Sequence, residues 1–176
     1  MGQLRCINGH RSAQSYSYQA LSRKKSVEEQ IRKKILALID EHRIMTIATL
    51  RPDGWPQATT VGYASDDITL YFLCGIDSQK AKNLSRDDRV SLTIDHDVPQ
   101  VMKISGLSMA GHARVVVNRG EAEKVLRLLI QKYPQQEDLP GPMPSPDEVR
   151  IFRVTPSVIS VLDYSKGFGH TDLVMC

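Results

Sequence analysis

A serine and two lysines that follow an apolar run form the clearest chemical pattern in the chain. The run 70–74 is typical of a strand, Gly75 breaks it, and Ser78 is placed to cap a short helix over 78–86. Lys80 and Lys82 then fall in the first turn, where a lysine costs about 0.3–1 kcal/mol unless an anion lies beside it. The Ser78 hydroxyl, the N–H groups near Gln79 and the Lys80 ammonium would together bind a phosphate. A solvent-exposed helix with scattered lysines is the alternative interpretation.

The C-terminal segment holds a second pair of polar groups. Lys166 and His170 alternate with glycines in "KGFGH", and an imidazole suits proton transfer near neutral pH. A loose chain end explains the segment equally well. No metal site is predicted, because His96 in "DHD" marks a strand end and the cysteines match no metal-binding spacing. The three cysteines are Cys6, Cys74 and Cys176.

Length and composition indicate one ordinary domain. The chain has 176 residues, of which 41% are hydrophobic and 24% charged. Residues 1–25 hold five basic and no acidic side chains, whereas residues 26–176 hold 18 basic and 20 acidic ones, a net charge of −2. The main body therefore gives no sign of nucleic-acid binding, and no apolar run predicts a membrane span. Free thiols and the lack of a secretory signal predict a cytoplasmic protein.

The pattern of apolar residues predicts a disordered basic tail over 1–25 and one domain over 26–176. The domain opens with a helix over 26–43, which Ser26 and Glu29 cap. Three strands joined by tight turns follow and predict an antiparallel meander. The strands are expected at 44–50, 56–64 and 68–74, with turns at 51–54 and 65–67.

The second half of the chain predicts further strands and one long helix. Strands are expected at 89–95 and 101–117, with Gly106 and Gly111 marking a bulge or bend. A helix over 119–133 and a proline-rich loop over 134–146 follow, and residues 148–165 form a strand pair interrupted at Pro156. Six or seven antiparallel strands with helices outside indicate a small closed barrel.

Residues 47–95 resemble the flavin mononucleotide (FMN)-binding split-barrel family related to pyridoxamine 5'-phosphate oxidase. An "AT" strand, a turn with Pro and "DG", a second strand, a hairpin, a Ser-x-Lys helix start and an "RVSL" strand occur here in the family's order. A weaker likeness continues through "GHARVV", residues 111–116.

The resemblance implies a mainly β (α+β) fold, a six-stranded antiparallel split β-barrel with flanking helices. It also implies a homodimer with FMN at the subunit interface. It implies eight cofactor-binding residues: Ser78, Gln79 and Lys80 at the phosphate, Thr59, Thr60 and Val61 along the ring, and Leu73 and Cys74 beside it.

The sequence also departs from that family's oxidases. Gln79 stands where they have arginine, and both an arginine near Thr59 and a substrate lysine near Ala64 are missing. The only tryptophan is Trp55, and no arginine follows Arg153. Pyridoxamine phosphate is therefore not the predicted substrate.

The predicted function is that of an FMN-dependent oxidoreductase acting on an unidentified small molecule. Three alternatives stay open: a flavin carrier or sensor without turnover, a haem-binding protein, and a deazaflavin-dependent reductase. His170 is the candidate catalytic residue, as a proton donor near the flavin. In a haem-binding protein it would instead ligate the iron, because some split barrels bind haem through a C-terminal histidine.

Overall fold

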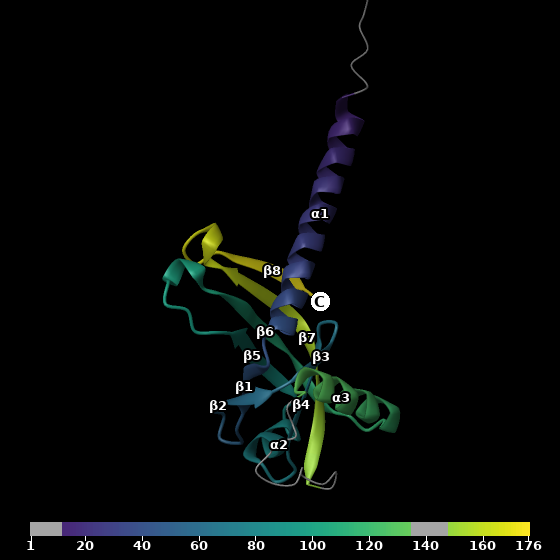
Figure 1. The fold of residues 1–176 in the computed structure, drawn as a ribbon, viewed down its shortest axis with the longest axis vertical. Helices are drawn as coiled ribbons and strands as arrows, with labels where there is room; N and C mark the ends of the chain where they lie inside the picture. The colour runs from purple at the N-terminus through teal and green to yellow at the C-terminus, as the bar shows by residue number, and fades with distance from the viewer. Residues whose placement is uncertain (1–11, 135–147) are drawn as a thin grey trace, which may run out of the picture. The chain divides into compact units, whose positions relative to one another are not determined.

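The computed structural model describes residues 12–134 and 148–176, with side chains from residue 27 onward (Figure 1). The chain divides into two units, Met1–Lys34 and Ile35–Cys176. The predicted proline-rich loop at 134–146 lies almost entirely outside the described residues.

The first helix, α1, spans Ser12–Glu41. It starts at Ser12 rather than at the predicted cap Ser26, so residues 12–25 are helical where a disordered tail was expected. Alanine, serine and lysine with no proline or glycine over 12–25 allow the helix to extend. In the second unit its apolar stripe of Ile35, Leu38 and Ile39 is buried.

All described strands belong to one curled antiparallel sheet in the order β2-β1-β5-β6-β7-β4-β3, with β8 paired to β7. The predicted split-barrel fold is confirmed, although the sheet has eight strands instead of six. The strands are β1 Ile44–Leu50, β2 Pro56–Gly62, β3 Ala64–Asp66, β4 Thr69–Gly75, β5 Arg89–Asp95, β6 Ser105–Val115, β7 Val149–Asp163 and β8 Thr171–Met175.

The predicted meander of three strands is wrong in one pairing, that between β2 and β4. The missing ladder between these two strands is the split in the barrel. β2 pairs with β1, but β4 pairs with β7 along its whole length and with the short β3 only over residues 69–71. β2 and β4 therefore touch without forming a ladder. Local turn signals predicted the hairpins correctly, but the choice of partner for β4 depends on β7, about 80 residues later in the chain.

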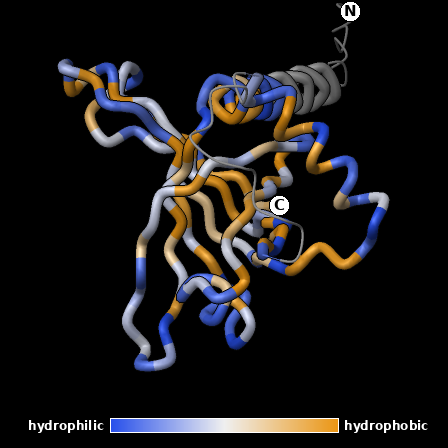
Figure 2. The backbone as a smooth tube through the Cα atoms, turned by 60° about the horizontal axis from the view of Figure 1, so that its bottom comes forward, coloured by the Kyte–Doolittle hydropathy of each residue, from blue (hydrophilic) through white to orange (hydrophobic). Residues whose placement is uncertain are grey.

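The core lies on the concave side of the sheet. β1 and β5 alternate strictly between exposed and buried residues along most of their length, as period-two patterning requires. Phe72 of β4 and Phe152 of β7 stack there with ring centroids 5.3 Å apart. Figure 2 shows the hydrophobic residues concentrated where the strands cross and the hydrophilic ones in the connections.

The long strands differ from prediction in two places. The segment expected to be one strand over 101–117 begins with a 3-10 helix, η1 Val101–Lys103, before β6. β7 runs unbroken through Pro156, where an interruption was predicted. The β6–β7 register shifts next to Gly111, so Pro156 sits at a bulge, where a missing N–H disturbs the ladder least. The predicted bulge at Gly111 is confirmed.

Two further helices flank the sheet. α2, Gln79–Leu84, contacts β1 and β4, and α3, Arg119–Lys132, contacts β3. Asn118 caps α3 by accepting a hydrogen bond from the Glu121 N–H at 2.9 Å. The C-terminal segment is no loose end: after η3, Tyr164–Lys166, it forms β8 along the second half of β7.

Candidate functional site

The candidate site is the corner where β2, β4 and α2 meet at the split. β2 is an edge strand bonded only to β1, and β4 beyond residue 71 is bonded only to β7. The facing edges of both strands therefore offer backbone N–H and C=O groups for hydrogen bonds with a ligand. All eight residues predicted to bind a cofactor lie on these three elements, so the fold brings them to one corner.

The start of α2 matches the sequence prediction. The Ser78 hydroxyl caps the helix by accepting a hydrogen bond from the Ala81 N–H at 3.2 Å. Gln79 is exposed, but its amide is turned along the helix and donates to Asn83 Oδ1 at 2.8 Å. The N–H groups of Gln79 and Lys80 precede the first helical hydrogen bond and stay available.

Lys80 is half-buried, and its Nζ lies 5.9 Å from the centroid of the Phe72 ring. Burial lowers the pKa of its ammonium, an effect that the nearby Cys74 partly offsets. Within residues 27–134 and 148–176, no carboxylate pairs with this amine. A partly desolvated cation without an anion is costly, which makes Lys80 the natural place for a negatively charged ligand group.

The three predicted residues of β2 divide between the two faces of the sheet. Thr59 and Val61 oppose the buried Ile47 and Met45 of β1, so they face the core, whereas Thr60 points outward. Thr59 Oγ1 is buried and has no hydrogen-bond partner among the described residues. An unsatisfied buried hydroxyl costs about 1–3 kcal/mol and therefore calls for an explanation.

The two predicted residues of β4 also face opposite ways. Cys74 shares the inner face with Phe72, and Leu73 lies on the outer face opposite Ile151. Both side chains are half-buried, and Cys74 is a free thiol. Together with Lys80, Cys74 lines the inner side of the corner.

A buried amide network that the sequence analysis missed fixes the corner. Asn83 of α2 is completely buried and donates to Thr49 Oγ1 at 2.9 Å and to Gln57 Oε1 at 3.3 Å. The side chain thus ties α2 to both β1 and β2. The one available signal was the spacing of Gln79 and Asn83, four residues apart on one helix face.

His170 does not join this group within one chain. It precedes β8, and its Nε2 lies 3.2 Å from Asp172 Oδ1, while Lys166 Nζ lies 2.7 Å from Asp172 Oδ2. β8 pairs with β7 up to Leu162, whereas Cys74 pairs with Arg150 near the opposite end of β7. About 40 Å of strand separates these two positions. A catalytic role for His170 therefore stays a prediction.

No group of three or more His, Cys, Asp or Glu side chains gathers to hold a metal ion in the part of the chain that the structure describes. No helix among the described residues is long and apolar enough to cross a membrane.

Comparison with known families identifies the chain's relatives. The family model described as pyridoxamine 5'-phosphate oxidase matches residues 31–163. The chain belongs to this family. The resemblance found in the motifs of residues 47–95 is thereby confirmed.

Solved structures of this fold include proteins with different descriptions. A conserved hypothetical protein from Mycobacterium tuberculosis is 26% identical with a TM-score of 0.64, covering 82% of this chain and 90% of that one. A putative pyridoxamine 5'-phosphate oxidase from Listeria innocua is 22% identical with a TM-score of 0.60, covering 76% and 98%. A haem-binding protein from Mycobacterium smegmatis is 15% identical with a TM-score of 0.65, and the match covers 82% of this chain but only 57% of that longer one.

Proposed function

We propose that the chain binds flavin mononucleotide at the corner of β2, β4 and α2 and acts as an oxidoreductase on a small molecule. The observation that supports this most directly is Lys80, a half-buried cation that has no acidic partner among the described residues. Membership of the oxidase family adds weight to a flavin over other anionic ligands.

The α2 end of the corner suits the phosphate. The N–H groups of Gln79 and Lys80 and the Lys80 ammonium supply hydrogen bonds and charge, while the Ser78 hydroxyl can still donate its proton. A phosphate there would offset the desolvation cost of the Lys80 amine. The phosphate is therefore expected to dominate the affinity.

The strand end of the corner suits the ring. The free edges of β2 and β4 offer alternating donors and acceptors, which match the polar edge of an isoalloxazine ring, and Thr59 Oγ1 is an unused hydroxyl on β2. When bound, the flavin supplies the electron-transfer chemistry. The residues of this chain hold the ring, exclude water from it and leave one face for a substrate.

The proposed assembly is a homodimer, because a corner open to solvent covers only one side of a planar ring.

The free thiols Cys74 and Cys176 fit a reducing compartment, so we propose that the protein is cytoplasmic.

The absorption spectrum of the purified protein tests this function, with FMN added where none copurifies. Flavin bands, reduction by a nicotinamide cofactor and reoxidation are the expected results. Flavin bands without turnover would reduce the function to a carrier or sensor. A Soret band would favour haem, and a spectrum that responds only to a deazaflavin would replace the cofactor. Protein that stays colourless with all of these would contradict the proposal.

A further inference from the structure

Arg150 of β7 lies beside the corner, on the inner face of the sheet. The ladder between β4 and β7 sets Arg150 directly opposite Cys74. Residues opposite each other on antiparallel strands project from the same face, and two positions further along this ladder Phe72 and Phe152 stack on the inner face. Arg150 therefore shares the inner face with Cys74.

The two arginines of β7 differ in their partners. Arg153 is opposite Tyr71 on the outer face, and its Nη1 donates to the two carboxylate oxygens of Glu121 at 3.0 and 3.2 Å. The guanidinium of Arg150, three residues earlier, has no hydrogen bond or ion pair within residues 27–134 and 148–176, although the residue is half-buried. A partly desolvated cation without an acceptor is unfavourable, so Arg150 resembles Lys80 and not Arg153.

Cys74 connects Arg150 to Lys80. The Cβ atoms of directly opposed residues such as Arg150 and Cys74 are about 4.5–5.5 Å apart. On the other side, the Cys74 thiol is close enough to Lys80 to affect the pKa of its ammonium. Lys80 Nζ also lies over the ring of Phe72, two residues before Cys74 on the same face. Two cations from different elements, α2 and β7, therefore border one thiol.

The charge of a phosphate calls for more than one cation. A phosphate monoester carries a charge of about −1.5 to −2 near pH 7. Lys80 supplies one positive charge, whereas Ser78 and Gln79 supply none. Arg150 would provide the second charge, and a guanidinium can donate two parallel hydrogen bonds to phosphate oxygens.

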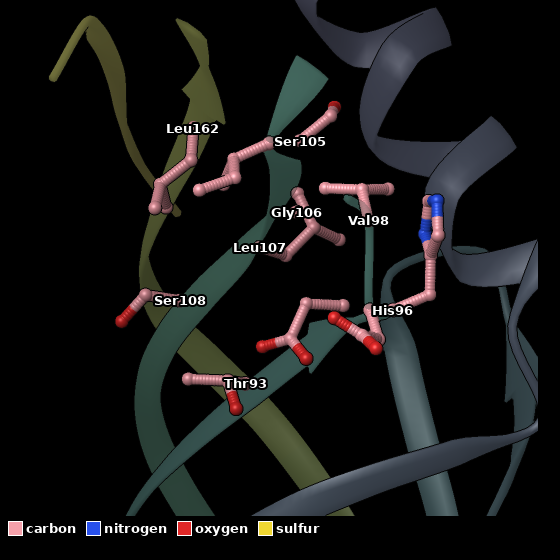
Figure 3. Close-up of a pocket in the computed structure, with 11 residues that line it drawn as sticks. Thr93, His96, Val98, Ser105, Gly106, Leu107, Ser108 and Leu162 are labelled. Atoms are coloured by element: carbon pink, nitrogen blue, oxygen red, sulfur yellow. The ribbon is translucent and has the colours of Figure 1, made fainter. Parts of the chain in front are cut away.

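A pocket beside the end of β5 is unsuited to the same ligand. It has a volume of about 240 Å³, and Asp95 and Asp97 help to line it. Figure 3 shows Gly106 of this pocket between Leu162 and Val98. The two carboxylates would repel a phosphate, and neither lysine nor arginine is among the residues that line the pocket. Of these two sites, only the corner suits an anion.

We propose that Arg150 is the second positively charged contact of the ligand's phosphate and thereby determines the preference for a phosphorylated ligand. The inference rests on the proposed function and adds to that site a residue from a fourth element, β7. Lys80 and Arg150 hold the phosphate from α2 and from β7, and together they balance its charge. Arg150 thus serves ligand binding and not the stability of the sheet.

Titration with FMN and with riboflavin, which lacks the phosphate, tests this role. Arg150→Gln is expected to weaken FMN by about 30-fold and riboflavin by less than about 3-fold. Arg150→Lys keeps the charge but not the two parallel hydrogen bonds, so its affinity for FMN should lie between those of Arg150→Gln and the unaltered chain. Arg153→Gln, on the opposite face of the same strand, is the matched control and should leave the ratio of the two dissociation constants unchanged. Circular dichroism verifies folding.

A second measurement does not depend on a flavin. Inorganic phosphate held by Lys80 and Arg150 would cover the Cys74 thiol and slow its alkylation by iodoacetamide, which mass spectrometry of the peptide containing Cys74 follows. Arg150→Gln is expected to raise the phosphate concentration that gives half-protection by about 10-fold. Arg153→Gln should leave this concentration unchanged.

The outcomes separate this inference from the proposed function. A selective loss of FMN affinity in Arg150→Gln supports the inference, whereas an equal loss for both flavins, or no loss, overturns it and leaves FMN binding standing. If the unaltered chain binds neither flavin, the proposed function fails and the phosphate measurement decides. Protection of Cys74 that weakens in Arg150→Gln then supports a phosphate contact, and protection that is unchanged, or absent in the unaltered chain, overturns it.

Discussion

Two half-buried lysines, Lys80 at the α2 corner and Lys132 in the last turn of α3, differ in the partners that surround their ammonium groups. Lys132 Nζ donates to the Ile39 carbonyl at 2.7 Å and lies 4.0 Å from the centroid of the Tyr63 ring. Lys80 has only the Phe72 ring, at 5.9 Å. Burial lowers the pKa of both, that of Lys132 to about 8. The chain itself satisfies Lys132, which joins α3 to α1, whereas the ammonium of Lys80 has no hydrogen-bond acceptor among the described residues.

The largest expected effect concerns what holds the α2 corner together. Asn83→Ala removes three side-chain hydrogen bonds and leaves the buried Thr49 hydroxyl without its donor, so the free energy of unfolding is expected to fall by about 3 kcal/mol. Urea denaturation measures the loss. Gln79→Ala, at the exposed end of the same network, is the control and is expected to cost less than about 1 kcal/mol. Equal losses would mean that the network does not fix the corner.

Removing the unsatisfied lysine should separate ligand binding from folding. Lys80→Ala is expected to weaken FMN by about 100-fold but riboflavin, which lacks the phosphate, by less than about 3-fold. Fluorescence titration with both ligands measures the ratio. Lys82→Ala is the matched control, since Lys82 is exposed on the same helix. An equal loss for both ligands would show that Lys80 does not contact the phosphate.

The lowered pKa of Lys132 should make the free energy of unfolding depend on pH. Because the pKa of Lys132 is about 8 in the folded chain, against 10.5 for an ordinary lysine, the unfolded chain binds more protons between these limits, and stability rises with pH. The rise from pH 8 to 9.5 is expected to be about 1 kcal/mol after allowance for solvent screening. Above about pH 10 the raised pKa of Tyr63 acts in the opposite direction.

Urea denaturation at several pH values, on the unaltered chain and on Lys132→Met, isolates this contribution. The difference in slope between the two proteins is the quantity of interest, because other groups titrate alike in both. Parallel curves would refute the assignment to Lys132.

The smallest expected effect concerns the buried Thr59 hydroxyl, which has no hydrogen-bond partner among the described residues. Thr59→Val keeps the shape of the side chain, removes the unpartnered oxygen and is expected to stabilise the ligand-free chain by about 0.5–1 kcal/mol. Thermal denaturation checks the gain, and Thr60→Val, on the outer face, provides the comparison. If a bound flavin uses the hydroxyl, the same variant should bind FMN less tightly. Destabilisation by Thr59→Val would mean that the oxygen has a partner in the folded chain.

Short-range patterns in the sequence determined most of the helices, strands and turns of this protein. Ser78 capping α2, Asn118 capping α3, the turn at 51–54 and the alternation of β5 act over a few residues, so their patterns predicted the elements correctly. The ordered motifs between residues 47 and 95 also identified the family, because they record a shared fold.

Only the tertiary structure decided which strands meet. The pairing of β4 with β7 rather than β2, the unbroken course of β7 through Pro156 and the burial of Asn83 depend on residues far apart in the chain. Strand partners are selected by packing and burial across the whole sheet, and a sequence pattern contains only the alternation within each strand.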